Sequence, residues 1–93
     1  MLPLTIRHEE SVHRFVAAMG GGEAVLEYVP AGEGVVDFVS TYVPDSLRHR
    51  QVGTQLVLHA LEDARARGLR VIPSCWFVRA VVERRPELAG LLV

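Results

Sequence analysis

The hydrophobic pattern of this chain changes its period at one place, residues 41–53, and this change decides which folds are open to it. Before that place, residues 5–8, 12–19, 24–29 and 35–43 are predicted as strands, because short β-type apolar runs alternate with glycine- and proline-rich turns. After it, apolar residues recur every three or four positions, as the buried face of a helix requires. This helical stripe consists of Val52, Leu56, Val57, Ala60, Leu61 and Ala64.

The rest of the chain adds one more strand and a second helix. Gly68 is well placed to end the first helix, and residues 69–72 read as a short apolar strand. Ser74 is expected to cap a helix from Cys75 to about residue 84, and Pro86 to begin a final helical turn. Successive strand, helix and strand segments imply a parallel pair joined by a right-handed crossover. The predicted fold class is therefore α/β: a small mixed sheet with an antiparallel meander, then this crossover and a C-terminal helix.

Length and composition limit the classes of function. A chain of 93 residues with an apolar fraction of 49% predicts one domain, residues 1–93, with a single modest core. One cysteine excludes an internal disulfide, and the histidines lack metal-ligand spacing, so no metal is predicted. A net charge of −1 argues against general nucleic-acid binding. With no membrane-spanning run and no secretory signal, we expect a cytoplasmic protein without a membrane partner.

The loop at the change of period predicts a site for phosphate. The strand stops at Pro44, and a loop that contains Arg48 and Arg50 enters the helix. The first N–H groups of a helix have no partner within it, and the helix dipole adds positive charge there, so oxyanions bind well. Guanidinium groups suit phosphate oxygens, and Gly53 has no side chain to keep a ligand away. Taken alone, arginines before a helix more often belong to an ordinary solvated turn than to a ligand site.

Several segments, in this order and spacing, resemble the Gcn5-related N-acetyltransferase fold. The closest similarity is to its minimal members, the short Gcn5-like N-acetyltransferase-domain proteins, and it covers nearly the whole chain. The segments are Gly22-Glu23-Ala24-Val25-Leu26-Glu27-Tyr28, Thr41-x-Val43-Pro44-x-x-Leu47-Arg48, Val71-Ile72-Pro73-Ser74-Cys75-Trp76-Phe77-Val78 and Glu83-Arg84-Arg85-Pro86-Glu87.

The resemblance implies that the chain binds acetyl-CoA and transfers its acetyl group to an amine of a small molecule or a protein. In the larger superfamily, a Gln/Arg-x-x-Gly-x-Gly/Ala loop holds the pyrophosphate, and this register falls here on residues 48–53, with Gln51 where glycine is usual. Backbone groups near Val43 are implied to contact the thioester, its oxyanion and the pantetheine. The implied cofactor-binding residues are Thr41, Val43, Arg48, His49, Arg50, Gln51, Val52, Gly53 and Thr54.

One departure from the family keeps two other functions open. The family tends to have His-Thr-Glu-Val at the end of the fourth strand, whereas this chain has Ser40-Thr41-Tyr42-Val43. Acetyl transfer requires a neutral amine, and no carboxylate is evident here to take its proton. The main alternative is thus a coenzyme A or acyl-CoA binding module without efficient transfer. A third hypothesis is an interaction domain whose loop binds a phosphorylated partner.

Cys75 is the second candidate catalytic residue, beside Val43. We predict it in the first turn of a helix beside the expected thioester, where the helix terminus and Arg79 would favour a thiolate. An acetyl-cysteine intermediate is one hypothesis, and a buried cysteine that packs as a small apolar residue is the other. The neighbouring Trp76 and Phe77 are expected in the core.

Overall fold

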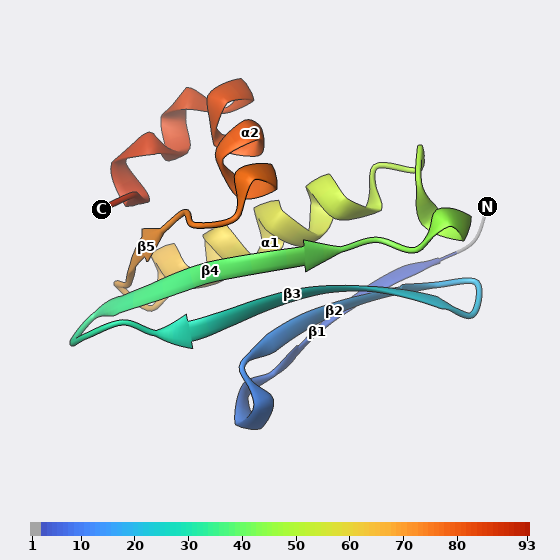
Figure 1. The fold of residues 1–93 in the computed structure, drawn as a ribbon, viewed down its shortest axis with the longest axis horizontal. Helices are drawn as coiled ribbons and strands as arrows, with labels where there is room; N and C mark the ends of the chain where they lie inside the picture. Colours follow the sequence, from blue (N-terminus) through green and yellow to red (C-terminus); the bar gives the residue numbers. More distant parts are fainter. Residues whose placement is uncertain (1–2) are drawn as a thin grey trace.

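The computed structural model describes residues 3–93, which form one five-stranded sheet in the order β1-β2-β3-β4-β5 with helices packed against it (Figure 1). The strands are β1 Leu4–Glu9, β2 Arg14–Met19, β3 Gly22–Pro30, β4 Val35–Tyr42 and β5 Arg70–Ile72. The helices are α1 Val52–Ala66 and α2 Trp76–Arg84, and short 3-10 turns span η1 Glu10–Val12, η2 Asp45–Leu47 and η3 Pro86–Leu91. Neighbouring strands are antiparallel up to β4, and β4 and β5 are parallel, which confirms the predicted fold class. No helix within residues 3–93 has the length and apolar character needed to cross a membrane.

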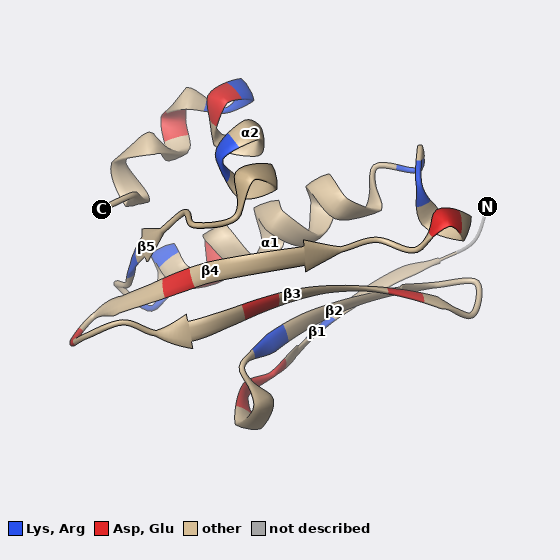
Figure 2. Cartoon of the chain, in the orientation of Figure 1, with Lys and Arg blue, Asp and Glu red and all other residues tan. Residues whose placement is uncertain are grey.

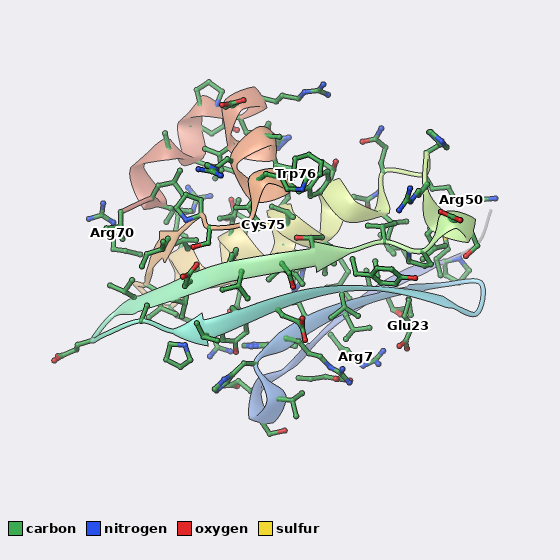
Figure 3. The ribbon with its side chains drawn as sticks, viewed as in Figure 1. Arg7, Glu23, Arg50, Arg70, Cys75 and Trp76 are labelled. Atoms are coloured by element: carbon green, nitrogen blue, oxygen red, sulfur yellow. The ribbon has the colours of Figure 1, made fainter. Side chains whose placement is uncertain are left out.

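The core lies between one face of the sheet and the helices. The alternation in β3 directs Ala24, Leu26 and Tyr28 into this core, and every residue of the predicted α1 stripe is buried there. The opposite face of the sheet carries ion pairs such as Arg7–Glu23, with a separation of 3.1 Å (Figure 3). Because exposed pairs of this kind contribute little, burial of the apolar face supplies most of the stability.

Two of the predicted boundaries differ from the structure for an identifiable local reason. β2 begins at Arg14 rather than at Val12, because His13 has a φ of 55°, which interrupts the extended backbone. The second helix begins at Trp76, and Cys75 rather than Ser74 occupies its N-cap position. The amide of Cys75 donates a hydrogen bond of 2.9 Å to the carbonyl oxygen of Phe38, which keeps Cys75 extended beside β4.

A β-bulge in β4 changes which side chains face the helices. Tyr28 pairs with Phe38 and Glu27 pairs with Ser40, so Val39 is left without a partner in β3. A bulge of this kind reverses the alternation of the strand beyond it.

As a result, odd-numbered residues of β4 face outward before the bulge and face the helices after it. Asp37, before the bulge, pairs with Val29 on the outer face. Thr41, after the bulge, pairs with the buried Leu26 on the face that α1 covers. The bulge therefore places polar side chains of one strand on both sides of the sheet.

β4 and β5 part soon after they meet. Their last paired residues are Asp37 and Ile72, while β4 continues to Tyr42. Beyond the hydrogen bond from Cys75 to Phe38, the described contacts give β4 no strand partner on this edge. The fold thus leaves a gap between two parallel strands, and Asp37 lies at the point where the strands separate.

Candidate functional site

A hollow of about 390 Å³ lies where the gap, the loop after β4 and the helix termini meet. Its lining residues are Thr41, Val43, Leu47, Arg48, His49, Gln51, Val52, Gly53, Thr54, Trp76 and Phe77. All the predicted cofactor-binding residues are among them except Arg50, which lies on the same loop (Figure 3). A second hollow of about 380 Å³ shares Gln51, Thr54, Trp76 and Phe77 with the first and extends to Arg84 and Arg85. The two together form a groove from the end of β4 along α2.

The first turn of α1 presents free backbone donors to this hollow. Gln51 is the N-cap residue, and its carbonyl accepts the first helical hydrogen bond from Gln55 at 3.0 Å. Within residues 3–93, no side chain caps the helix. The amides of Val52, Gly53 and Thr54 therefore lack partners inside the helix and lie at the wall of the hollow.

The backbone of the loop adopts a conformation that glycine prefers. His49 has a φ of 66° and Gln51 a φ of 61°, both in the left-handed region. For a residue with a side chain this region costs roughly 1–2 kcal/mol. In the resemblance described above, Gln51 falls where glycine is usual, and its left-handed φ is one that glycine adopts without strain.

We therefore expect Gln51→Gly to stabilise the protein. Removing the left-handed strain exceeds the entropy that glycine loses on folding, so the net gain should be about 0.5–1 kcal/mol. Loss of the side chain should also widen the hollow and tighten the acetyl-CoA binding that the resemblance implies, which calorimetry measures alongside thermal unfolding. Gln55→Gly is the matched control, because the same change inside α1 should cost about 1 kcal/mol. Equal destabilisation by both variants would contradict the prediction.

One buried side chain anchors the loop, and Arg48 folds back over it. Leu47 is only 4% exposed, and a Cβ atom on Gly22 would lie 3.2 Å from its Cγ atom. The Arg48 Nε group donates to the carbonyl oxygen of Val43 at 3.3 Å and lies 3.3 Å from an Asp45 carboxylate oxygen. The terminal guanidinium nitrogens of Arg48 make no hydrogen bond to the residues that the structure describes, so they remain available in this basic loop (Figure 2).

Gly53 serves packing as well as the predicted approach of a ligand. A Cβ atom at this position would lie 3.0 Å from the Val43 Cγ2 atom and 3.2 Å from the Phe77 ring. The absence of a side chain therefore lets α1 pack closely against the end of β4 and the start of α2. Substitution of Gly53 would disturb the fold together with any ligand, so it is a poor probe of binding alone.

Cys75 and Trp76 are placed differently from the sequence expectation. Cys75 is buried between β4 and α2, and its Sγ atom lies 3.5 Å from the Thr41 hydroxyl oxygen (Figure 3). It adjoins the hollow without lining it, and it precedes α2 instead of lying in its first turn. Trp76 is 72% exposed, so its predicted core position was wrong. The buried face of α2 consists of Val78, Val81 and Val82, and Trp76 lies off that face.

Asp37 is the residue that sequence reasoning missed. Its Oδ1 atom is shielded from solvent and has no hydrogen-bond partner among the residues described. Buried polar atoms nearly always have a hydrogen-bond partner, so this oxygen is a candidate to accept a hydrogen bond from a ligand. The sequence signal was a single acidic residue in the apolar β4, the red segment of that strand in Figure 2. No group of three potential metal ligands is found within residues 3–93.

Comparison with known proteins identifies the family of the chain. The family model described as GCN5-related N-acetyl-transferase matches residues 14–91. The chain is also similar to Protein NATD1 of Danio rerio, with 27% identity over 86 residues, which span 90% of this chain and 78% of that protein. The family match covers most of the chain, from β2 to β5 with the loop and both helices. This chain belongs to the GCN5-related N-acetyltransferase family.

Proposed function

We propose that the chain binds acetyl-CoA in the groove and transfers its acetyl group to an amine. The observation that carries this proposal is the row of unpartnered amides at Val52, Gly53 and Thr54 beside Arg48, in a hollow large enough for a ligand. A pyrophosphate bound there would accept hydrogen bonds from the amides and meet the positive end of the helix dipole. The family supports acetyl transfer as the activity.

The groove offers matching surfaces for the other parts of the coenzyme. The unpaired edge of β4 beyond Phe38 would hydrogen-bond the amide groups of the pantetheine arm, which would bring the thioester towards Val43 and the gap between the strands. In the second hollow, the exposed ring of Trp76 offers a stacking face for the adenine. Arg84 and Arg85 lie beside it and would contact the phosphates of the nucleotide.

The same geometry suggests how the proton of the amine is removed. In direct transfer, the amine nitrogen attacks the thioester carbonyl carbon, the C–S bond breaks and coenzyme A leaves as a thiolate. The amine must also lose a proton, and we assign its acceptance to the Asp37 carboxylate at the fork of β4 and β5. The donor would lie on the Thr41 side of the sheet and the amine would enter from the Asp37 side, and the two would meet in the gap.

A binding module without efficient transfer is the second candidate. Tyr42 stands where the family tends to have glutamate, and its side chain is 62% exposed. This position therefore offers no carboxylate near the thioester. Detection of an acetylated amine by mass spectrometry would exclude the binding-module candidate.

Calorimetry with acetyl-CoA, coenzyme A and ADP tests the donor site. We expect all three to bind, because each carries the pyrophosphate. Arg48→Ala should weaken binding by about 1–3 kcal/mol, since it removes a charge-assisted contact. Arg50→Ala is the matched control: it removes the same charge from the same loop but from a residue outside the hollow, and should have a smaller effect. Failure of all three ligands to bind would contradict the proposal and would favour a phosphorylated protein partner.

A further inference from the structure

A separate cavity of about 220 Å³ lies near the other end of α1 and shares no lining residue with the groove. It exists because α1 presents the small side chains of Ala60 and Ala64 where the sheet presents aromatic rings. Its remaining lining residues are His8, Glu10, His13, Phe15, Tyr28, Pro30, Val36, Phe38, Asp63, Arg67 and Leu69.

Aromatic rings form the walls of this cavity. The His8 and Phe15 rings stack with centroids 4.0 Å apart and planes 11° from parallel, and the Tyr28 ring lies 5.7 Å from Phe15. His13 lies 5.4 Å from Tyr28, and its left-handed backbone is fixed by a hydrogen bond of 3.0 Å from the Tyr28 amide to its carbonyl oxygen. An apolar cavity of about 150 Å³ can hold benzene, so this one has room for a single substituted ring.

The rim of the cavity carries two carboxylates and one guanidinium group, so its net charge is negative. Arg67 contacts the Glu10 carboxylate at 3.2 Å and the Asp63 carboxylate at 3.0 Å. The hydrogen bond from Arg67 lowers the pKa of Glu10, so this carboxylate is charged at neutral pH. Two carboxylates therefore share one guanidinium at the mouth, beside rings whose faces attract cations.

Deeper in the cavity, Tyr28 has a hydroxyl proton to donate. A terminal Arg67 nitrogen lies 3.3 Å from the Nδ1 atom of His8, and a guanidinium can only donate, so Nδ1 is the acceptor. This assignment places the imidazole proton on Nε2, which donates to the Tyr28 oxygen at 2.5 Å. Tyr28 is more than nine-tenths buried, and burial raises its pKa, so it keeps its own proton. That proton has no partner within the described part of the chain and suits an acceptor atom on a ligand.

We propose that this cavity binds a small aromatic amine with a polar substituent on its ring. The ring lies in the cavity against the rings of His8, Phe15 and Tyr28, the substituent accepts the Tyr28 proton, and the ammonium group joins the carboxylates of Glu10 and Asp63 at the mouth. The site is independent of acetyl-CoA binding, because it shares no residue with the groove.

Tyramine is the probe that tests the proposal, added to the full chain without coenzyme and followed by NMR shifts and calorimetry. A single-ring ligand of this size should bind with a Kd of about millimolar and shift the signals of Tyr28 and Ala64. Two related compounds separate the contributions: tyrosol keeps the ring but lacks the charge, and butylamine keeps the charge but lacks the ring. Both should bind more weakly. Equal binding of tyrosol, or no shift with tyramine, would overturn the proposal.

Variants locate the binding within the molecule. Asp63→Asn should weaken tyramine about threefold to tenfold, while Glu62→Gln, its exposed neighbour paired with Arg65, should not. Ala64→Leu should fill the cavity and abolish binding, and retained binding by the folded variant would overturn the site.

Discussion

Replacing Asp37 with asparagine should lower the rate of acetyl transfer by about 10²–10⁴-fold, the usual contribution of a positioned base, and leave acetyl-CoA binding unchanged. The asparagine amide has nearly the same shape but cannot accept the proton of an ammonium group. The rate is measured as thiol release with lysine, spermidine and tyramine as acceptors, using the amine that the parent acetylates fastest.

The same substitution should not destabilise the protein, which separates a catalytic role from a structural one. The shielded Oδ1 atom of Asp37 has no hydrogen-bond partner in the part of the chain that the structure describes, so its charge is poorly compensated in the folded state. Removing the charge should therefore leave the Tm equal to that of the parent or higher. Reduced activity together with equal or greater stability is typical of a residue kept for function.

Glu27→Gln is the matched control for this experiment. Glu27 also lies on the outer face, and its carboxylate accepts a hydrogen bond of 3.1 Å from the Ser40 hydroxyl, so it already has a partner. Its amide variant should transfer acetyl at nearly the parent rate. Full activity in Asp37→Asn would contradict the assignment. If Cys75→Ala then abolished transfer and the parent carried an acetyl group on Cys75, the covalent route would replace direct transfer.

Much of the fold follows from local periodicity. The two-residue alternation of β3 and the three- and four-residue stripe of α1 each define one apolar face, and the two faces can be buried only against each other. The boundaries at His13 and Cys75 could not be predicted in this way. The first depends on a left-handed backbone at a residue other than glycine, and the second on a hydrogen bond to Phe38, distant in sequence.

The candidate site was predictable to the extent that it is built from consecutive backbone. The loop and the first turn of α1 lie together because they are neighbours in the chain, so their residues could be named from the sequence. Asp37 differs, because its place at the end of the β4–β5 pairing depends on where β5, distant in sequence, leaves β4. The role of Gly53 in packing against Phe77 likewise depends on a contact between two helices.

The second large effect is expected at Leu47, which connects the loop to the core. Leu47→Ala should cost about 2–5 kcal/mol, because it removes a side chain that is 4% exposed and leaves a cavity beneath the loop. At roughly 4–8 °C per kcal/mol for a domain of this size, the Tm should fall by more than about 8 °C. Acetyl-CoA affinity should fall as well, since the loop that carries Arg48 and Gln51 would have to be ordered on binding.

Leu88→Ala distinguishes this local effect from a general loss of stability. Leu88 is 3% exposed and lies in η3, away from the loop, so its truncation should cost a similar free energy of unfolding. Calorimetry is carried out at a temperature where both variants are folded. A weaker affinity in Leu47→Ala alone would mean that the buried anchor positions the loop for the coenzyme. Equal affinities would mean that the loop keeps its shape without the anchor, and its conformation would then depend on the hydrogen bonds within η2 and those of Arg48.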